Sequence, residues 1–153
     1  MIAAVANRPD SLAARIDKVR SALEAVPLSL IQLMARIGVA TVFWKSGQAK
    51  IANWDLTVQL FQDEYRVPIL SPSVAASIAT TFELAMPVLL VLGLASRLAT
   101  LPLLGMVLVI QLFVYPQAWS EHLVWGSILL FLLTRGGGAL SLDHLIARRV
   151  SGK

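Results

Sequence analysis

The sequence contains no cysteine, few charged residues and only two histidines. Of its 153 residues, 14% are charged, and cysteine is absent altogether. The absence of cysteine excludes disulfide bonds, thiolate-ligated zinc, iron–sulfur clusters and dithiol relays. Because His144 follows the last apolar segment, only His122 is placed near the apolar region. We therefore expect neither a bis-histidine haem nor a metal site.

Apolar residues dominate the composition instead. Hydrophobic residues make up 57% of the chain, whereas soluble domains are about half apolar and about a quarter charged. The net charge of +4 comes from basic residues that are spread along the chain rather than gathered in a stripe. The composition predicts a small integral membrane protein that does not bind nucleic acid. The polar N-terminal stretch has no early apolar run, so a cleaved signal peptide is not expected.

Four apolar segments are candidates for membrane-spanning helices. They cover residues 27–43, 74–94, 98–115 and 123–134, and the last extends back to Trp119 if His122 is included. A spanning helix needs about 20 residues, with a range of roughly 17–25. The second and third segments meet this length, whereas the first and fourth do so only with their flanks. The sequence thus predicts an all-α integral membrane protein built as a four-helix bundle.

The distribution of lysine and arginine predicts the orientation of these spans, because basic residues accumulate on the cytoplasmic side. Nine basic residues fall on the side of the two termini and three on the other side. The nine are Arg8, Arg15, Lys18, Arg20, Arg97, Arg135, Arg148, Arg149 and Lys153, and the three are Lys45, Lys50 and Arg66. Both termini are therefore expected in the cytoplasm, which agrees with an even number of spans.

The connection between the first two spans contains an amphipathic segment. Its apolar stripe recurs at helical spacing and consists of Trp54, Val58, Phe61 and Tyr65. This pattern predicts an interfacial amphipathic helix that lies on the outer leaflet and caps the bundle.

The remaining segments divide the chain into three parts. Residues 1–26 carry apolar residues at helical spacing and are predicted to form a cytoplasmic amphipathic segment. Residues 27–135 form the four-span domain. Residues 136–153 form a cytoplasmic basic tail, in which glycines end the last span and Ser141 begins a short helix.

Two opposite charges lie near the centres of the first two predicted spans. Glu83 stands in the apolar run TTFELAMPVLLVLGL, and a carboxylate in hydrocarbon is costly unless it is paired or protonated. Arg36 occupies the middle of the first span at a matching depth. We therefore expect Arg36 and Glu83 to form an ion pair. Such a pair either holds the helices in register or lines a site for a polar head group or for proton transfer.

Aromatic and polar residues gather at the junction QLFVYPQAWSEHLVW. One interpretation is an aromatic belt at the outer membrane surface. The other is a site for a quinone or another planar ligand, with His122 or Tyr115 as hydrogen-bond donor and Trp119 among the aromatic faces. Lys50, after the first apolar run, either extends to the interface or binds an anionic substrate. No nucleophile with a neighbouring base and no phosphate-binding loop is present.

Several strings of the sequence, taken together, point to one family. They are Arg36 with Gly38, KIANWDLTVQLFQDEYRVPILSP, AASIATTFELAMPVLLVLGLASRLA and VIQLFVYPQAWSEHLVWGSILLFLLTRGGGALSLD, from about Arg36 to Asp143. In these strings the chain resembles the DoxX family of small four-helix membrane proteins. The resemblance implies a multi-pass bacterial inner-membrane protein with a redox association, since relatives include membrane subunits of thiosulfate:quinone oxidoreductase and members linked to oxidative-stress complexes. It also maps the family's recurrent polar positions to Arg36, Lys50, Glu83, Arg97 and His122.

The favoured functional hypothesis is a membrane component of a redox or quinone-linked system. It binds quinone or a redox-protein partner around the Arg36–Glu83 pair, without a covalently bound cofactor. In a catalytic version Glu83 or His122 moves protons during quinone reduction, although the chain alone does not make a complete enzyme. The predicted ligand-binding residues are Arg36, Lys50, Arg97, Tyr115 and Trp119. The alternatives are a non-catalytic scaffold or assembly partner and, less favoured, a small-solute transporter. Association with further copies of the chain is compatible with each of them.

Overall fold

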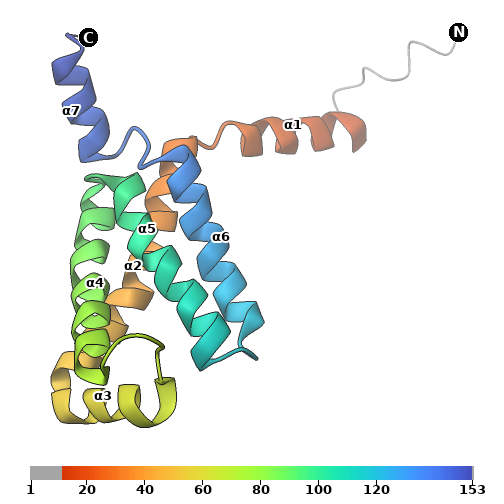
Figure 1. Cartoon of the computed structure of the whole chain (residues 1–153). Coiled ribbons are helices and arrows are strands. Elements are labelled where there is room, and N and C mark those ends of the chain that lie inside the picture. Colours follow the sequence, from red (N-terminus) through yellow and green to blue (C-terminus); the bar gives the residue numbers. More distant parts are fainter. Residues whose placement is uncertain (1–11, 153) are drawn as a thin grey trace, which may run out of the picture.

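The structure is a computed structural model that describes residues 12–152 (Figure 1). Within this range every regular element is helical, which confirms the predicted all-α class. Residues 1–11 and 153, including Arg8 and Lys153 of the predicted topology, lie outside the described residues. The elements are α1 (Leu12–Glu24), α2 (Leu28–Ala52), α3 (Trp54–Leu60), the π-helix η1 (Phe61–Tyr65), α4 (Pro72–Leu92), α5 (Ser96–Val109), the π-helix η2 (Ile110–Val114), α6 (Trp119–Arg135) and α7 (Leu142–Val150).

Three helices in the described range are long and apolar enough to cross a membrane. They are α2, α4 and the continuous pair of α5 and η2, with 25, 21 and 19 residues. They correspond to the first three predicted spans, but α2 continues to Ala52, well past the predicted end at Phe43. The fourth predicted span corresponds to α6, which has 17 residues. That α6 also crosses the membrane stays a prediction.

The helices α2, α4, α5 and α6 pack side by side around one apolar core (Figure 1). The buried core residues are Val39, Ala40, Phe43, Leu90, Ala99, Leu103, Val107, Leu129 and Leu132. Large apolar side chains also cover the outside of the same helices, including Met34, Leu108 and Leu130. Helices that are apolar both inside and outside are typical of proteins surrounded by hydrocarbon.

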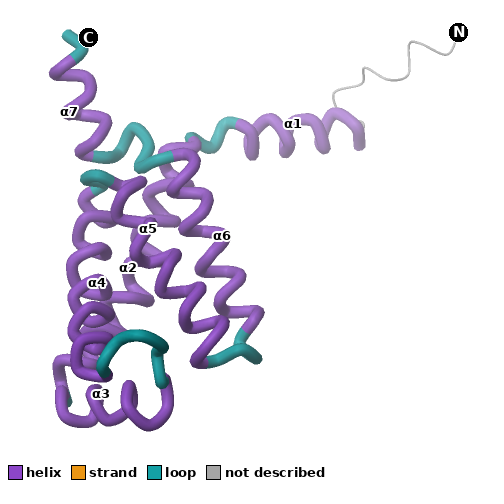
Figure 2. The backbone as a smooth tube through the Cα atoms, viewed as in Figure 1, coloured by secondary structure: helices purple, strands orange, loops and turns teal. Residues whose placement is uncertain are grey.

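The helices α3 and η1 close one end of the packed helices, which we call the α3 end (Figure 1). Phe61 is buried against Ala75 and Ala76 in the first turns of α4. Val58 and Tyr65 of the predicted stripe pack against the same cluster, whereas Trp54 is largely outside it. The predicted helix in this connection therefore exists, and its position at a membrane surface stays a prediction. A loop leads from η1 back to α4 (Figure 2).

The opposite end carries α1 and α7, and we call it the α7 end (Figure 1). The Asp143 carboxylate accepts hydrogen bonds from the Ala95 and Ser96 amides at 2.7 and 2.9 Å, where α5 begins. The Asp143 amide donates to the Gly93 carbonyl at 2.9 Å. The segment predicted as a separate basic tail is thus joined to the turn between α4 and α5. Ser141 begins α7 as predicted, since its Oγ accepts a hydrogen bond from the His144 amide.

Two side chains of α2 complete the contacts at the α7 end. Gln32 Nε2 donates to the Arg135 and Gly136 carbonyls, both at 3.1 Å. Arg36 Nη2 donates to the Leu140 carbonyl at 2.6 Å. We call this set of contacts among α2, the α4–α5 turn and the Gly136–Ser141 loop the α7-end clasp. It satisfies carbonyl groups at the end of α6, which have no partner within their own helix.

The α7-end clasp predicts that Gly93 does not tolerate a side chain. Gly93 has a φ of +69°, and an added Cβ would collide with Arg36 Nη1 and with Ser141. We expect Gly93→Ala to lower the free energy of unfolding by about 2 kcal/mol or more, from the left-handed backbone and the collision together. The matched control is Gly38→Ala, because a Cβ at Gly38 meets no atom within 4 Å. Reversible unfolding in mixed micelles measures the free energy of unfolding of both variants. Equal values would contradict the described packing.

Candidate functional site

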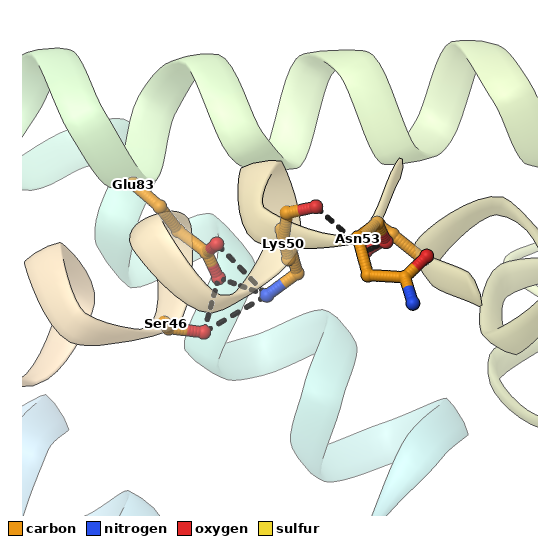
Figure 3. A network of polar contacts seen from close by, with 5 residues as sticks. Ser46, Lys50, Asn53 and Glu83 are labelled. Carbon is orange, nitrogen blue, oxygen red and sulfur yellow. Dashed lines mark hydrogen bonds and ion pairs between the residues drawn. The ribbon is translucent and has the colours of Figure 1, made fainter. Parts of the chain in front are cut away.

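An ion pair between Lys50 and Glu83 lies inside the packed helices, toward the α3 end (Figure 3). Lys50 Nζ is 2.8 Å from Oε1 and 2.8 Å from Oε2 of Glu83. The side chains are only 15% and 3% exposed, so the pair is largely withdrawn from solvent. Ser46, one helical turn before Lys50, donates to Glu83 Oε1 at 3.0 Å and accepts from Lys50 Nζ at 2.8 Å. Glu83 is therefore paired and hydrogen-bonded, as a buried charge requires.

The predicted Arg36–Glu83 pair is wrong. The helices α2 and α4 are antiparallel, and the register places Gly47 beside Glu83 and Arg36 beside Gly93. From Arg36 to Lys50 the helix rises by about 21 Å, at roughly 1.5 Å per residue. The prediction took the first span to end at Phe43, which put Arg36 at its centre. Because α2 runs to Ala52, the residue opposite Glu83 is Lys50 instead.

Arg36 belongs to the α7-end clasp. It is 1% exposed and donates to the Leu140 carbonyl. Since Arg36 joins α2 to the loop that follows α6, the structure supports a structural role at this position.

A cavity of about 580 Å³ adjoins the Lys50–Glu83 pair and reaches to the α3 end. It lies between the second half of α2, η1, the first half of α4, α5, η2 and the start of α6. Its wall is mostly apolar and includes Phe61, Ala75, Ile78, Ala79, Phe82, Pro102, Gly105, Met106, Val109, Ile110 and Trp125. Its polar groups are Ser46, Lys50, Tyr65, Glu83, Tyr115, Glu121 and His122. An apolar cavity of this size with a few convergent polar groups is typical of small-molecule sites.

His122 occupies the α6 side of the cavity and is held by Gln111 of η2. His122 is 4% exposed, and its Nδ1 lies 2.6 Å from Gln111 Oε1. Gln111 Nε2 in turn donates to the Pro116 carbonyl at 2.8 Å. The ring also lies 5.4 Å from the ring of Trp125, centroid to centroid. The position and rotation of the imidazole are thus fixed by its surroundings.

Tyr115 and Glu64 close the α3 end of the cavity. Tyr115 Oη donates to Glu64 Oε1 at 2.6 Å, which joins η1 to the end of η2. The Tyr115 and Tyr65 rings meet edge to face at a centroid distance of 6.0 Å. The hydrogen bond to Glu64, together with partial burial, raises the pKa of Tyr115 well above its usual value. The phenol therefore stays a donor across the physiological pH range.

The structure separates the predicted site residues into three groups. Lys50, Glu83, Tyr115 and His122 line the same cavity. Trp119 is 57% exposed and lines a smaller hollow of about 380 Å³ on the other side of His122. Arg36 and Arg97 lie at the α7 end, where Arg97 borders a surface hollow beside Arg135 and Gly136.

The sequence analysis missed Ser46, Glu64 and Gln111. Ser46 stands four residues before Lys50, so the two share one face of α2. Gln111 interrupts the apolar run VIQLFV, and an isolated amide among apolar residues was a signal that it has a buried partner. The contact of Glu64 with Tyr115 spans 51 positions and has no local signal.

The Lys50–Glu83 pair predicts strong energetic coupling between these two residues. Lys50→Met leaves a buried carboxylate without its cation, so we expect a loss of about 3 kcal/mol or more in the free energy of unfolding. Lys50→Met combined with Glu83→Gln should recover much of that loss. The matched comparison is Arg36→Met combined with Glu83→Gln, whose effects should add within about 0.5 kcal/mol. Unfolding of the wild type, the three single variants and the two double variants in mixed micelles measures both couplings. Additivity for Lys50 and Glu83 would refute the pair.

The Tyr115–Glu64 hydrogen bond predicts a shifted ionisation of one of the two tyrosines. Tyr115 should form tyrosinate only well above pH 10, about where an unperturbed phenol ionises. Because the folded-state pKa is raised, the associated stability is complete below that pH and is lost as the pH rises further. The difference between the absorbance titrations of the wild type and of Tyr115→Phe isolates the ionisation of Tyr115. Glu64→Gln should move the ionisation of Tyr115 back toward lower pH, and an unchanged titration would exclude the hydrogen bond as its cause.

Comparisons with known proteins place the chain in one family. The DoxX family model matches residues 31–116, which is more than half of the chain. The matched range contains Arg36, Lys50, Glu83 and Tyr115, whereas His122 lies beyond it. No curated protein and no solved structure matches the chain. The extent of the family match, together with helices fit to cross a membrane, shows that the chain is a membrane protein of the DoxX family.

Proposed function

We propose that this protein is a four-span membrane component of a redox system and that its cavity binds a quinone in either oxidation state. Members of the DoxX family are generally associated with redox-linked membrane systems. The observation that carries the proposal is the convergence of Lys50, Glu83 and His122 on one apolar cavity.

The packing of α6 supports four spans. Leu129 and Leu132 of α6 are buried in the same core as α2 and α5. At about 1.5 Å per residue, 17 residues extend about 25 Å, close to the hydrocarbon thickness of roughly 30 Å. With four spans, both ends of the described chain lie on one side. Arg15, Lys18, Arg148 and Arg149 lie in the helices at that end, so the α7 end faces the cytoplasm of a bacterial inner membrane.

The charges around the cavity favour an uncharged ligand. Lys50 is neutralised by Glu83 at 2.8 Å, and Glu121 adds a further carboxylate to the wall. An anionic substrate such as thiosulfate would therefore meet no free positive charge from Lys50. A quinone is uncharged, with an apolar ring and tail and polar oxygens at opposite ends of the ring. These properties fit an apolar wall with polar groups on α2 and α6.

The chain needs a second protein to complete an electron path. It contains no cysteine, so it supplies neither a dithiol nor cysteine-ligated iron. In the proposed system a redox-protein partner exchanges electrons with the quinone, while this chain holds the quinone and its protons. Glu83 and His122 are the proton-handling candidates, because both line the cavity and carry ionisable groups.

Binding of a short-chain benzoquinone to the purified protein in lipid nanodiscs tests the proposal. Quinones quench tryptophan fluorescence, and Trp125 lines the cavity. We expect saturable quenching in the wild type and at least tenfold weaker binding in Ala79→Phe, which fills the cavity. The matched control is Ala85→Phe, because Ala85 is exposed and absent from the cavity wall. Equal affinities of the two folded variants, or no saturable binding by the wild type, would refute the proposal and favour a scaffold role.

A further inference from the structure

The hydrogen bonds around Gln111 determine which of its side-chain atoms faces His122. The Pro116 carbonyl lies 2.8 Å from Gln111 Nε2. A carbonyl oxygen only accepts hydrogen bonds, so the amide nitrogen of Gln111 must be the atom beside it. The Gln111 oxygen then points at His122, from which it accepts. The orientation of this amide follows from the backbone oxygen that anchors it.

The same reasoning determines where His122 carries its hydrogen. Gln111 Oε1 lies 2.6 Å from His122 Nδ1 and has no hydrogen to donate. Nδ1 must therefore donate, and in the neutral imidazole Nε2 is left with a lone pair. Gln111 and His122 are both buried, so water does not compete for this bond. Gln111 and Pro116 thus hold His122 in one tautomer.

The Nε2 atom is the ring nitrogen of His122 that is left for a ligand, and the His122 side chain lines the cavity. Nε2 makes no hydrogen bond to any residue between 12 and 152. His122 lines the cavity together with Lys50, whose ammonium has three hydrogens and donates two of them, to Ser46 and to Glu83 Oε1. The cavity therefore offers a hydrogen-bond acceptor on α6 and a donor on α2.

We propose that Gln111 is a positioning residue, which keeps His122 as an acceptor so that the cavity prefers a hydroquinone to the corresponding quinone. This inference rests on the proposed function. A quinone oxygen only accepts, and facing Nε2 it would bring two lone pairs together. A hydroquinone hydroxyl donates to Nε2, while its second oxygen accepts from Lys50. Because one hydrogen bond is gained and one repulsion avoided, we expect about tenfold tighter binding of the hydroquinone.

Nitrogen NMR of histidine-labelled protein in nanodiscs tests the tautomer directly. His144→Gln leaves His122 as the single histidine, since the sequence contains two. We expect a protonated Nδ1 and an unprotonated Nε2 at neutral pH. Gln111→Met should abolish this fixed assignment. A hydrogen on Nε2 in the wild type, whether in the other tautomer or in the imidazolium, would overturn the proposal.

The preference for the hydroquinone is tested by measuring two affinities, one for a short-chain benzoquinone and one for its hydroquinone. The hydroquinone is kept reduced under anaerobic conditions. The wild type should favour the hydroquinone by about tenfold, and Gln111→Met should lose the preference. Gln111→Glu removes the donor to the Pro116 carbonyl and places a negative charge beside His122, which favours the imidazolium, so this variant should lose the preference as well. Equal affinities in the wild type would overturn this inference but leave the proposed function standing, whereas no binding of either form would overturn both. If folded Gln111→Met still prefers the hydroquinone, Gln111 is not the cause of the preference and the proposal is wrong. If that variant does not fold, the proposal is decided by the ratio of the two wild-type affinities and by the NMR assignment of His122.

Discussion

The contact between Lys50 and Glu83 determines how the α3 end of the molecule is built. A buried carboxylate must be compensated, and Glu83 finds its compensation only where Lys50 and Ser46 lie beside it. This requirement sets the register of α2 against α4. The register in turn requires a small residue at Gly47, where an added Cβ would lie 3.0 Å from the Cβ of Glu83. The backbone carbonyl of Lys50 also accepts from Thr57 at 2.9 Å, which attaches α3 to the end of α2.

The two ends of the packed helices use polar groups in different ways. At the α7 end, Arg36, Gln32 and Asp143 bind backbone carbonyls and amides, which satisfies helix ends and joins segments that are distant in sequence. At the α3 end, Lys50 and His122 lie on the wall of a cavity and are held by other side chains. The partners of the first group are backbone atoms of the fold itself, although Nε and Nη1 of Arg36 have no hydrogen-bond partner among the described residues. The second group lines the cavity described above, so we place the candidate site at the α3 end.

The sequence predicted the helices well and their mutual register poorly. Apolar runs and glycine or serine at helix ends are local signals, and they located the helices α2, α4, α5 and α6 and the start of α7. The depth of a charged residue depends on where its helix ends, and the end of α2 was misplaced because Lys45 and Lys50 resemble the start of a loop. Lys50 is tolerated inside the helix because Glu83 neutralises it, which is a tertiary effect. The role of Asp143 is also a tertiary effect that local sequence does not reveal. Asp143 lies in α7, but its carboxylate accepts hydrogen bonds from the backbone amides at the start of α5.

Hydrogen-bond direction is the property by which this cavity can distinguish two oxidation states of one ligand. A quinone and its hydroquinone are both uncharged and nearly equal in shape, so neither the apolar wall nor the compensated Lys50–Glu83 pair separates them. They differ in whether an oxygen carries a hydrogen. A histidine free to change tautomer would accommodate both forms, whereas His122 is restrained through Gln111 to the Pro116 carbonyl, a backbone atom that cannot reverse its role. The selectivity of the site would therefore originate outside the cavity, in the backbone turn that follows η2.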